Sequence, residues 1–279
     1  MLERSVKMSK VVVQECENYD VLRVVEKINS GVEILGGWGK FLHKGMTVLI
    51  KVNLIGPKSS DTAAVTHSEF VRALTKILIS KGCTVWIGDS SGGAIAGIAP
   101  TAASFEVSGL AKVAREEGAE IKNFDREGAV KVDKTDGALG DMYLAKPLFE
   151  ADFIINSPKL KTHTAGIYTG AVKNLFGCVP GLRKAGYHKA APNPKDFGQI
   201  IVDINEAIVP GIHIMDGITA MEGEGPTAGE VYSAKKILIS TDPLALDTVA
   251  MKMIGLDIAD IPIYDAARER SLGKYQLEI

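Results

Sequence analysis

Short apolar runs alternate with longer amphipathic stretches along most of this chain of 279 residues. Apolar runs of about four to eight residues are typical of buried strands, whereas apolar residues spaced three and four apart are typical of helices. Strands that alternate with helices along a chain predict an α/β fold, in which a mostly parallel sheet is flanked by helices. The expected strands are Val11–Gln14, Thr47–Val52, Thr84–Gly88, Phe153–Asn156, Ile212–Met215 and Ile237–Ser240.

Three helices are indicated by their first residues. The stretch His67–Lys81 is the clearest of them, because Thr66 and Glu69 have the spacing of a capping box. A second helix is expected after Asp196, where apolar residues recur on one face. A third is expected to begin at Asp242-Pro243, since Asp is a favoured N-cap residue and Pro is favoured at the first helical position.

Size and composition limit the class of protein. The length allows one large domain or two lobes, and we expect two lobes, residues 1–152 and 153–279, around a basic crevice. The 34 acidic and 32 basic residues give a net charge of −2, which argues against a nucleic-acid-binding protein. No apolar run reaches the ~20 residues that span a bilayer, and no apolar stretch of a signal peptide follows the N-terminal charges. These features predict a cytoplasmic protein with no membrane or nucleic-acid partner.

Polar residues follow the expected strands at the points where the strands end. Each of these residues lies at the end of a strand: Asn53, Asp89 and Asp216 come directly after one, and Asn156 is the last residue of another. In open parallel sheets the ligand crevice lies beyond the carboxyl ends of the strands. We therefore expect these side chains to converge on one crevice although they are far apart in sequence.

The strongest functional signal is a long segment without acidic residues. Residues 153–195 contain no Asp or Glu over 43 positions, although 34 acidic residues in 279 predict about five. Its basic residues are Lys159, Lys161, Lys173, Arg183, Lys184, Lys189 and Lys195. Positive charge concentrated in this way predicts a site for an anion. The alternative is that the lysines form an ordinary solvated surface.

Within this acid-free segment, several residues are candidates for binding the anion. Lys159 and Lys161 alternate in an extended stretch and should therefore point the same way. Residues 169–177 predict a short helix with Thr169 as its N-cap, and the free N–H groups of such a helix start would attract an anion. The expected anion-binding residues are Lys159, Lys161, Asn53, Thr169, Asn174 and His188.

His163 and Lys173 are the candidate catalytic residues. The lysines that flank His163 should lower the pKa of its imidazole and keep it neutral, as a general base or a metal ligand must be. A hydrogen-bonding residue at a strand end is the alternative interpretation of His163. Lys173 lies in the middle of the expected short helix and would hold the anion beside it.

Asp216 and Glu222 are the candidates for a metal site. They belong to the Gly-rich segment 216–226, which is expected to be a loop after a strand. Carboxylates in such a loop could hold a divalent cation, could pair with the lysines across the crevice, or could simply be exposed. No glycine-rich phosphate-binding motif and no nucleophile-elbow motif is present, so the sequence assigns no other cofactor.

These residues resemble the uncharacterised family called domain of unknown function 362. The resemblance rests on KVNL at 51–54, GDS at 88–90, PKLKTH at 158–163, TGAVKNLFG at 169–177, DG at 216–217, MEG at 221–223, and DP at 242–243 with Asp247. Members of that family are often fused to a ferredoxin-like module with two four-iron clusters. The resemblance therefore implies redox chemistry and a ferredoxin-type partner. The three cysteines Cys16, Cys83 and Cys178 cannot ligate such clusters, so no iron–sulfur cluster is expected within this chain.

A second similarity is more distant and concerns His163 and Lys173 alone. The nickel-pincer lactate racemase family has a His followed ten residues later by a Lys in a Gly-rich stretch, and that lysine bears a covalently attached, nicotinate-derived nickel cofactor. His163 and Lys173 have the same spacing.

The sequence as a whole predicts an enzyme that binds a small anionic substrate or cofactor, of the carboxylate or phosphate kind, in a crevice of lysines and histidines. Two alternatives remain open at this point. One is a non-catalytic module that delivers a ligand or docks a ferredoxin, in which case the lysines should lie on a convex surface rather than in a concave pocket. The other is an isomerase similar to the nickel-pincer racemases.

Overall fold

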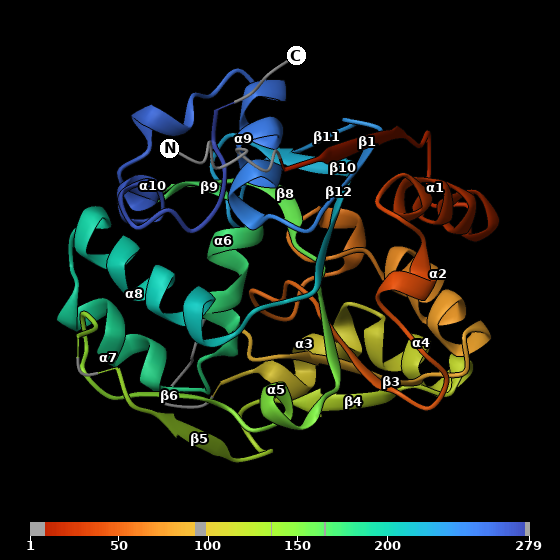
Figure 1. The fold of residues 1–279 in the computed structure, drawn as a ribbon, viewed down its shortest axis with the longest axis horizontal. Coiled ribbons are helices and arrows are strands. Elements are labelled where there is room, and N and C mark those ends of the chain that lie inside the picture. The colour runs from red at the N-terminus through yellow and green to blue at the C-terminus, as the bar shows by residue number, and fades with distance from the viewer. Residues whose placement is uncertain (1–8, 93–98, 135, 165, 277–279) are drawn as a thin grey trace, which may run out of the picture.

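One mixed sheet organises the chain (Figure 1). The computed structural model describes residues 9–276, apart from 93–98, 135 and 165. In the described residues, ten strands join this sheet, and its main path runs in the order β1-β12-β10-β7-β2-β3-β4. The strands of the path are β1 (Val11–Glu15), β2 (Thr47–Lys51), β3 (Thr84–Asp89), β4 (Glu120–Asn123), β7 (Phe153–Asn156), β10 (Ile212–Glu222) and β12 (Lys236–Ser240).

The centre of the sheet is parallel and one edge is antiparallel. Strands β10, β7, β2, β3 and β4 are parallel neighbours, whereas β12 is antiparallel to both β10 and β1. The strands β8 (Lys159–His163) and β11 (Glu230–Tyr232) pair with β10, and β9 (Ile167–Thr169) pairs with β8. The strands β5 (Ala129–Val132) and β6 (Met142–Ala145) form a separate hairpin. The expected α/β fold with a mostly parallel sheet is confirmed.

Helices cover both faces of the sheet because its strands are apolar on both sides (Figure 1). Val48 and Ile50 of β2 belong to one hydrophobic core, and Leu49 between them belongs to the other. The first core includes residues of α1 (Val21–Ile34), α2 (Ser68–Ser80), α3 (Thr101–Val107) and α4 (Leu110–Glu117). The second includes residues of α5 (Pro147–Glu150), α6 (Ala171–Asn174), α8 (Pro194–Ala207), α9 (Pro243–Met253) and α10 (Asp265–Glu269).

Shorter elements complete the chain. The helix α7 (Arg183–Ala190) lies against α8, and single 3₁₀ turns are formed by Trp38–Lys40, Ser60–Thr62, Leu175–Cys178, Ile258–Asp260 and Pro262–Tyr264. Strands from both sides of residue 152 join the main sheet, in which β12, β10 and β7 lie between β1 and β2. No described helix is both long and apolar enough to cross a membrane.

Helix starts agree with the sequence at one position and differ at two. Asp242 caps α9 as predicted, accepting a hydrogen bond from the Ala245 amide at 2.9 Å. The helix expected after Asp196 begins earlier, at Pro194, because Asn193 is its cap. The capping box predicted at Thr66 is wrong: His67 is the N-cap of α2, and the Thr66 hydroxyl instead donates to the Ser157 carbonyl.

Candidate functional site

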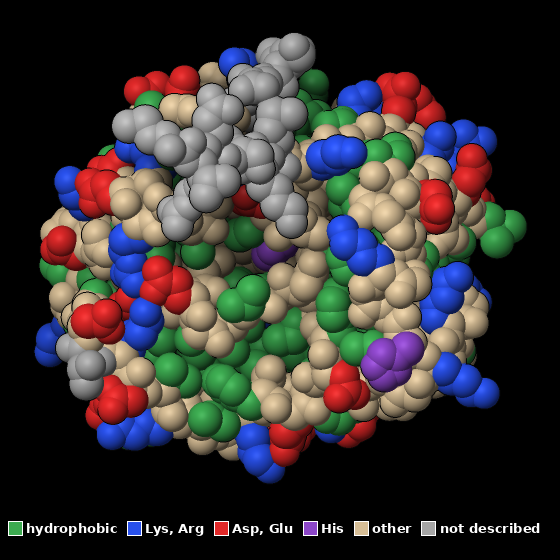
Figure 2. All heavy atoms as spheres, viewed as in Figure 1, with side chains coloured by type: hydrophobic (Ala, Val, Ile, Leu, Met, Phe, Trp, Pro, Cys, Tyr) green, Lys and Arg blue, Asp and Glu red, His purple; other side chains and the backbone are tan. Residues whose placement is uncertain are grey.

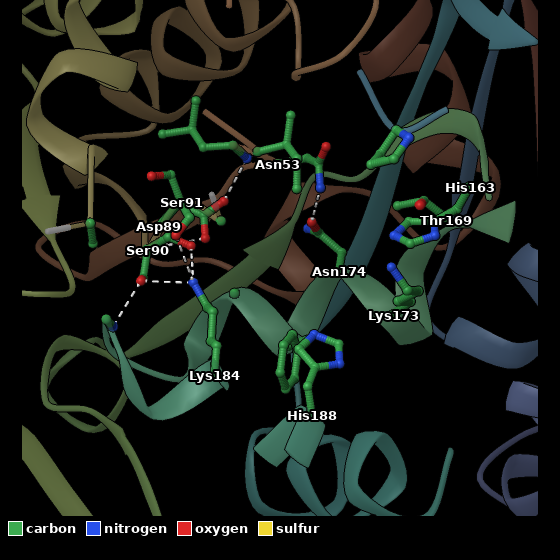
Figure 3. A pocket seen from close by; sticks show the side chains of 18 of the residues that line it. Asn53, Asp89, Ser90, Ser91, His163, Thr169, Lys173, Asn174, Lys184 and His188 are labelled. Atoms are coloured by element: carbon green, nitrogen blue, oxygen red, sulfur yellow. Dashed lines mark hydrogen bonds between the residues drawn. The ribbon is translucent and has the colours of Figure 1, made fainter. Parts of the chain in front are cut away.

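A cavity of about 320 Å³ lies beyond the carboxyl ends of β2 and β3, where the polar residues were expected to converge (Figure 3). It is closed on its other sides by β8, by the segment that contains α6, and by α7. The expected site residues that line it are Asn53, Lys161, His163, Thr169, Lys173, Asn174 and His188. The sequence therefore located the wall of one cavity from residues spread over more than a hundred positions.

Lys173 brings a side-chain amine to the wall of the cavity. It projects from α6 toward the His163 ring and Thr169 (Figure 3). No hydrogen bond or ion pair joins its Nζ to another residue in the described part of the chain. Burial alone lowers the pKa of this amine to about 8. A large fraction of Lys173 is therefore already neutral slightly above neutral pH.

The helix that carries Lys173 is held by an acid from far along the sequence. The Asp247 carboxylate on α9 accepts hydrogen bonds from the amides of Ala171 and Val172, at 2.7 and 2.9 Å. The predicted N-cap Thr169 is thus wrong: Gly170 is the N-cap residue, and the first N–H groups of α6 are bound by Asp247 rather than open to an anion. Gly170 is required there, because a Cβ atom would lie 2.1 Å from Asp247 Oδ1.

Lys161 is a second amine of the cavity and is 1% exposed. Its Nζ donates one hydrogen bond, to the Ala64 carbonyl at 2.5 Å, and no ion pair is formed with a described carboxylate. Burial, and next the positive charges of Lys173 and Lys159, lower its pKa well below the ordinary value for lysine. When this amine is protonated, two of its three N–H bonds remain for a ligand.

His163 is held as a neutral hydrogen-bond donor. Burial and the nearby charges of Lys173, Lys161 and His188 lower its pKa to about 3. Its Nδ1 accepts a hydrogen bond from the Gly166 amide at 3.1 Å. A neutral imidazole whose Nδ1 accepts must carry its proton on Nε2, so this ring offers an N–H rather than a lone pair at that atom.

Lys184 occupies the opposite end of the cavity from Lys173 (Figure 3). Its Nζ donates to the Ser90 carbonyl, to Ser90 Oγ at 2.7 Å and to the Ser91 carbonyl at 3.2 Å, so its donors are already used. Asp89 is the only carboxylate among the described residues of the cavity wall, and it forms a buried ion pair of 3.0 Å with Lys51. The wall therefore carries an excess of positive groups.

Asparagine side chains form a buried chain of hydrogen bonds behind the cavity. Asn53 Nδ2 donates to Asn174 Oδ1 at 2.9 Å, and Asn174 Nδ2 donates to Asn156 Oδ1 at 2.7 Å. Asn156 Nδ2 in turn lies 2.9 Å from the Ala171 carbonyl and 3.0 Å from His213 Nδ1. This chain fixes both amides of the cavity wall. Asn53 Oδ1 remains buried without a partner among the described residues, as does Thr169 Oγ1.

His188 lines the cavity from α7 and is held between aromatic rings. It stacks on Phe197 with ring centroids 4.4 Å apart and meets Phe176 edge-on at 5.0 Å. A smaller cavity of about 80 Å³ shares His163, Lys173 and His188 with the first and adds an apolar wall that includes Phe197 and Ile263. Lys173 thus borders two cavities.

Three expected residues do not line the cavity. Lys159 is fully buried and donates to Asp216 Oδ2 at 2.8 Å and to the Tyr19 hydroxyl at 2.8 Å. Asp216 also accepts the amide of His67 at 3.0 Å and the Tyr19 hydroxyl at 2.7 Å, so of its expected roles the structure shows pairing with a lysine. Glu222 lies apart from it, exposed at the end of β10.

The segment expected to be an acidic loop is a continuation of the strand β10 as far as Glu222. The described residues contain no group of three His, Cys, Asp or Glu side chains that could hold a metal ion. The described side chains around Asp216 and Glu222 therefore do not fit the expected site for a divalent cation.

Comparison with known proteins places the chain in a family. The model of a domain of unknown function, DUF362, matches residues 48–252. The chain belongs to this family. The resemblance drawn from the motifs is thereby confirmed, and the family's description assigns no activity.

A curated relative of this DUF362 protein is the thylakoid-associated protein sll1697 of Synechocystis sp., which is 34% identical over 256 residues, covering 91% of this chain and 77% of the relative. Among solved structures, the apoprotein of lactate racemase from Thermoanaerobacterium thermosaccharolyticum superposes with a TM-score of 0.53 at 9% identity. That match covers 85% of this chain and 55% of the racemase, so the chain spans about half the length of the solved structure it matches. At this identity, the likeness shows a shared fold.

Three residues important to this site were not among the expected site residues: Lys51, Lys184 and Asp247. Lys184 carried a usable signal, because it precedes His188 by four residues and so shares its face of α7. Lys51 ends an otherwise apolar strand, which is an unusual place for a lysine without a buried partner. Asp247 gave no local signal, since it lies inside a helix and acts on a different one.

Proposed function

We propose that the cavity binds a small anion of the carboxylate or phosphate kind, and that this DUF362 protein is an enzyme that acts on it. The observation that carries the proposal is the pair of amines Lys161 and Lys173. Both border the cavity, and neither forms an ion pair with a described carboxylate. A buried amine without a counter-charge is unfavourable unless it is neutral or a ligand supplies the charge.

The charges of the wall support an anion rather than a cation as ligand. Lys161, Lys173 and Lys184 line the cavity, while the one carboxylate of its described wall, Asp89, is engaged by Lys51. An anion in the cavity would favour the protonated forms of Lys161 and Lys173, and its binding should therefore be accompanied by proton uptake.

The placement of the lysines favours an enzyme with a ligand cavity over a module that docks a ferredoxin. Of the basic residues in the acid-free segment, Lys159 and Lys161 are buried and Lys173 and Lys184 lie in the cavity wall, which leaves only Arg183, Lys189 and Lys195 on the surface. The face drawn in Figure 2 shows acidic and basic side chains interspersed around a hydrophobic centre, with no large area of one sign. A concave set of amines is typical of a ligand site, whereas a ferredoxin-docking module would need them outside.

The finer predictions remain part of this proposal. The spacing of His163 and Lys173 is similar to that of the nickel-pincer racemases, and the fusion of other family members to ferredoxins suggests redox chemistry by analogy alone. No contact in this cavity distinguishes a racemase from a redox enzyme. The first property to measure is therefore the binding of small anions.

Isothermal titration calorimetry with phosphate and with oxalate tests the proposal, run in two buffers of different ionisation enthalpy. We expect saturable binding of at least one of these anions with proton uptake, lost in Lys161→Met and Lys173→Met and retained in Lys189→Met. Lys189 is a matched control because it belongs to the same acid-free segment but is exposed on α7. Equal binding by all four proteins, or no binding by the unaltered protein, would show that the amines do not form an anion site.

A further inference from the structure

We propose that Lys173 is a nucleophile that forms an imine with the carbonyl group of a small oxo acid bound in the cavity. This inference rests on the proposed function, because it takes the anion site as the seat of the acid group and adds a reactive partner beside it. It is carried by the difference between the lysines that surround the cavity and by the position of Lys173 between two cavities.

Lys173 is the lysine of the described wall whose amine has no partner. Lys184 Nζ is committed to oxygens of Ser90 and Ser91, and Lys161 Nζ is anchored on the Ala64 carbonyl. The described residues give Lys173 no hydrogen bond or ion pair that would have to break before its nitrogen attacks a carbon. Its lone pair is therefore available whenever the amine is neutral.

The surroundings of Lys173 keep part of it neutral near physiological pH. Burial lowers its pKa to about 8. Lysines that form imines are commonly activated in this way, by removal of the amine from water. At pH 7 a pKa of about 8 leaves a neutral fraction roughly 300-fold above that of an ordinary lysine.

Space on both sides of Lys173 matches the shape of an oxo acid. The larger cavity offers Lys161 to a carboxylate, with two N–H bonds left after its bond to Ala64. The smaller cavity of about 80 Å³, on the side of Phe197 and Ile263, is apolar and fits a short alkyl substituent. A carbonyl carbon between these two ends would lie next to Lys173, which borders both cavities.

The step is balanced by the groups present. The Lys173 nitrogen attacks the carbonyl carbon, so that a C–N bond forms and the carbonyl electrons move to oxygen. The two amine protons pass to that oxygen, the C–O bond breaks, and one water molecule leaves the imine. No oxidant or reductant takes part, and proton transfer to the imine nitrogen gives the iminium ion that would activate the adjacent carbon.

Reductive trapping tests the inference. The full chain is incubated separately with glyoxylate, pyruvate and acetoacetate in the presence of cyanoborohydride, and adducts are located by intact mass and peptide mapping. With at least one acid, we expect modification of Lys173 to exceed that of the exposed Lys189 by roughly tenfold or more, given the larger neutral fraction at Lys173. Prior addition of oxalate, which has no ketone or aldehyde carbonyl, should reduce the adduct at Lys173 and leave the adducts of surface lysines unchanged.

Two variants separate this inference from the proposed anion site. Lys173→Arg keeps a positive charge but cannot form an imine, so it should lose the selective adduct while oxalate still binds. Lys189→Arg should behave as the unaltered protein. The protection by oxalate is measured on the unaltered chain and needs no variant to fold.

The outcomes are distinct. A selective, oxalate-protected adduct at Lys173 supports imine formation. Oxalate binding without a selective adduct from any of the three acids overturns it and leaves the anion site standing. Adducts that are spread over surface lysines and persist unchanged in Lys173→Arg also overturn it. If neither oxalate nor phosphate binds, both the anion site and the imine are refuted.

Discussion

Replacing Lys173 by methionine should stabilise the protein, by an amount that depends on pH. The pKa of Lys173 falls from 10.5 to about 8 on folding, a difference worth about 3 kcal/mol at 1.36 kcal/mol per unit. Below pH 8 the amine is protonated in both the folded and the unfolded chain, and the folded state carries the whole unfavourable free energy of the buried charge. Methionine has a similar length and no charge, so Lys173→Met removes this term.

The pH dependence of the difference follows from the same shift. Between pH 8 and 10.5 the unfolded chain binds the proton and the folded chain does not, so the stability of the unaltered protein rises with pH in this window. The advantage of Lys173→Met should therefore be about 3 kcal/mol at pH 7 and fall to about 1 kcal/mol at pH 10. At pH 7 this corresponds to a rise in melting temperature of roughly 5–10 °C.

Urea unfolding at pH 7 and at pH 10, followed by circular dichroism, measures both values. The exposed Lys189→Met is the control and should change the free energy of unfolding by less than about 0.5 kcal/mol at either pH. A Lys173→Met protein that is less stable than the parent at pH 7, or a difference that does not shrink toward pH 10, would refute the view that Lys173 lacks a partner.

Three further substitutions test the supports of the site. Asp216→Asn should lower the free energy of unfolding by about 3–5 kcal/mol, because it leaves the buried Lys159 without its counter-charge, and the double variant Lys159→Met/Asp216→Leu should recover most of that loss in the same urea experiment. Asp247→Asn should lower the free energy of unfolding by about 2–4 kcal/mol, because one amide cannot accept from two backbone N–H groups and two tyrosine hydroxyls as the carboxylate does. Amide hydrogen exchange at Ala171 and Val172 should also become faster in this variant. Unchanged exchange would contradict the capping role of Asp247. Gly177→Ala should disrupt the ion pair of Asp89 and Lys51, because a Cβ atom would lie 2.3 Å from Asp89 Oδ1, whereas Gly186→Ala in α7, with nothing within 4 Å, should be neutral or stabilise by about 0.5–1 kcal/mol in thermal unfolding.

The elements that the sequence predicted are those whose signals are local. The apolar strands β2, β3 and β7 appear within a residue or two of their expected ends, since such runs are buried on both faces. The strand β10 was expected to end at Met215 but extends to Glu222, because β8 and β11 pair with its second half. Gly217 and the acidic residues of that half indicated a loop, and tertiary pairing overrode this local preference.

The site was predictable to a similar degree. The lack of acidic residues identified the segment that supplies Lys161, Lys173 and His188, because an excess of one charge can be read without knowing the fold. What the sequence could not show is which lysine has a partner. Lys159 and Lys161 are two residues apart in one strand, yet one is paired with Asp216 and the other lines the cavity, and only the packing of β8 on β10 decides between them.

The pairing of β1 with β12 has a consequence for how the chain is made. Val11 lies opposite Ser240, so β1 leaves the ribosome long before the strand with which it pairs. Asp247, which holds the helix of Lys173, emerges later still. Pairings so distant in sequence are slow to form. Until these residues emerge, the nascent chain has an unpaired edge strand and an unfinished binding site, and chaperones would protect it from aggregation during this period.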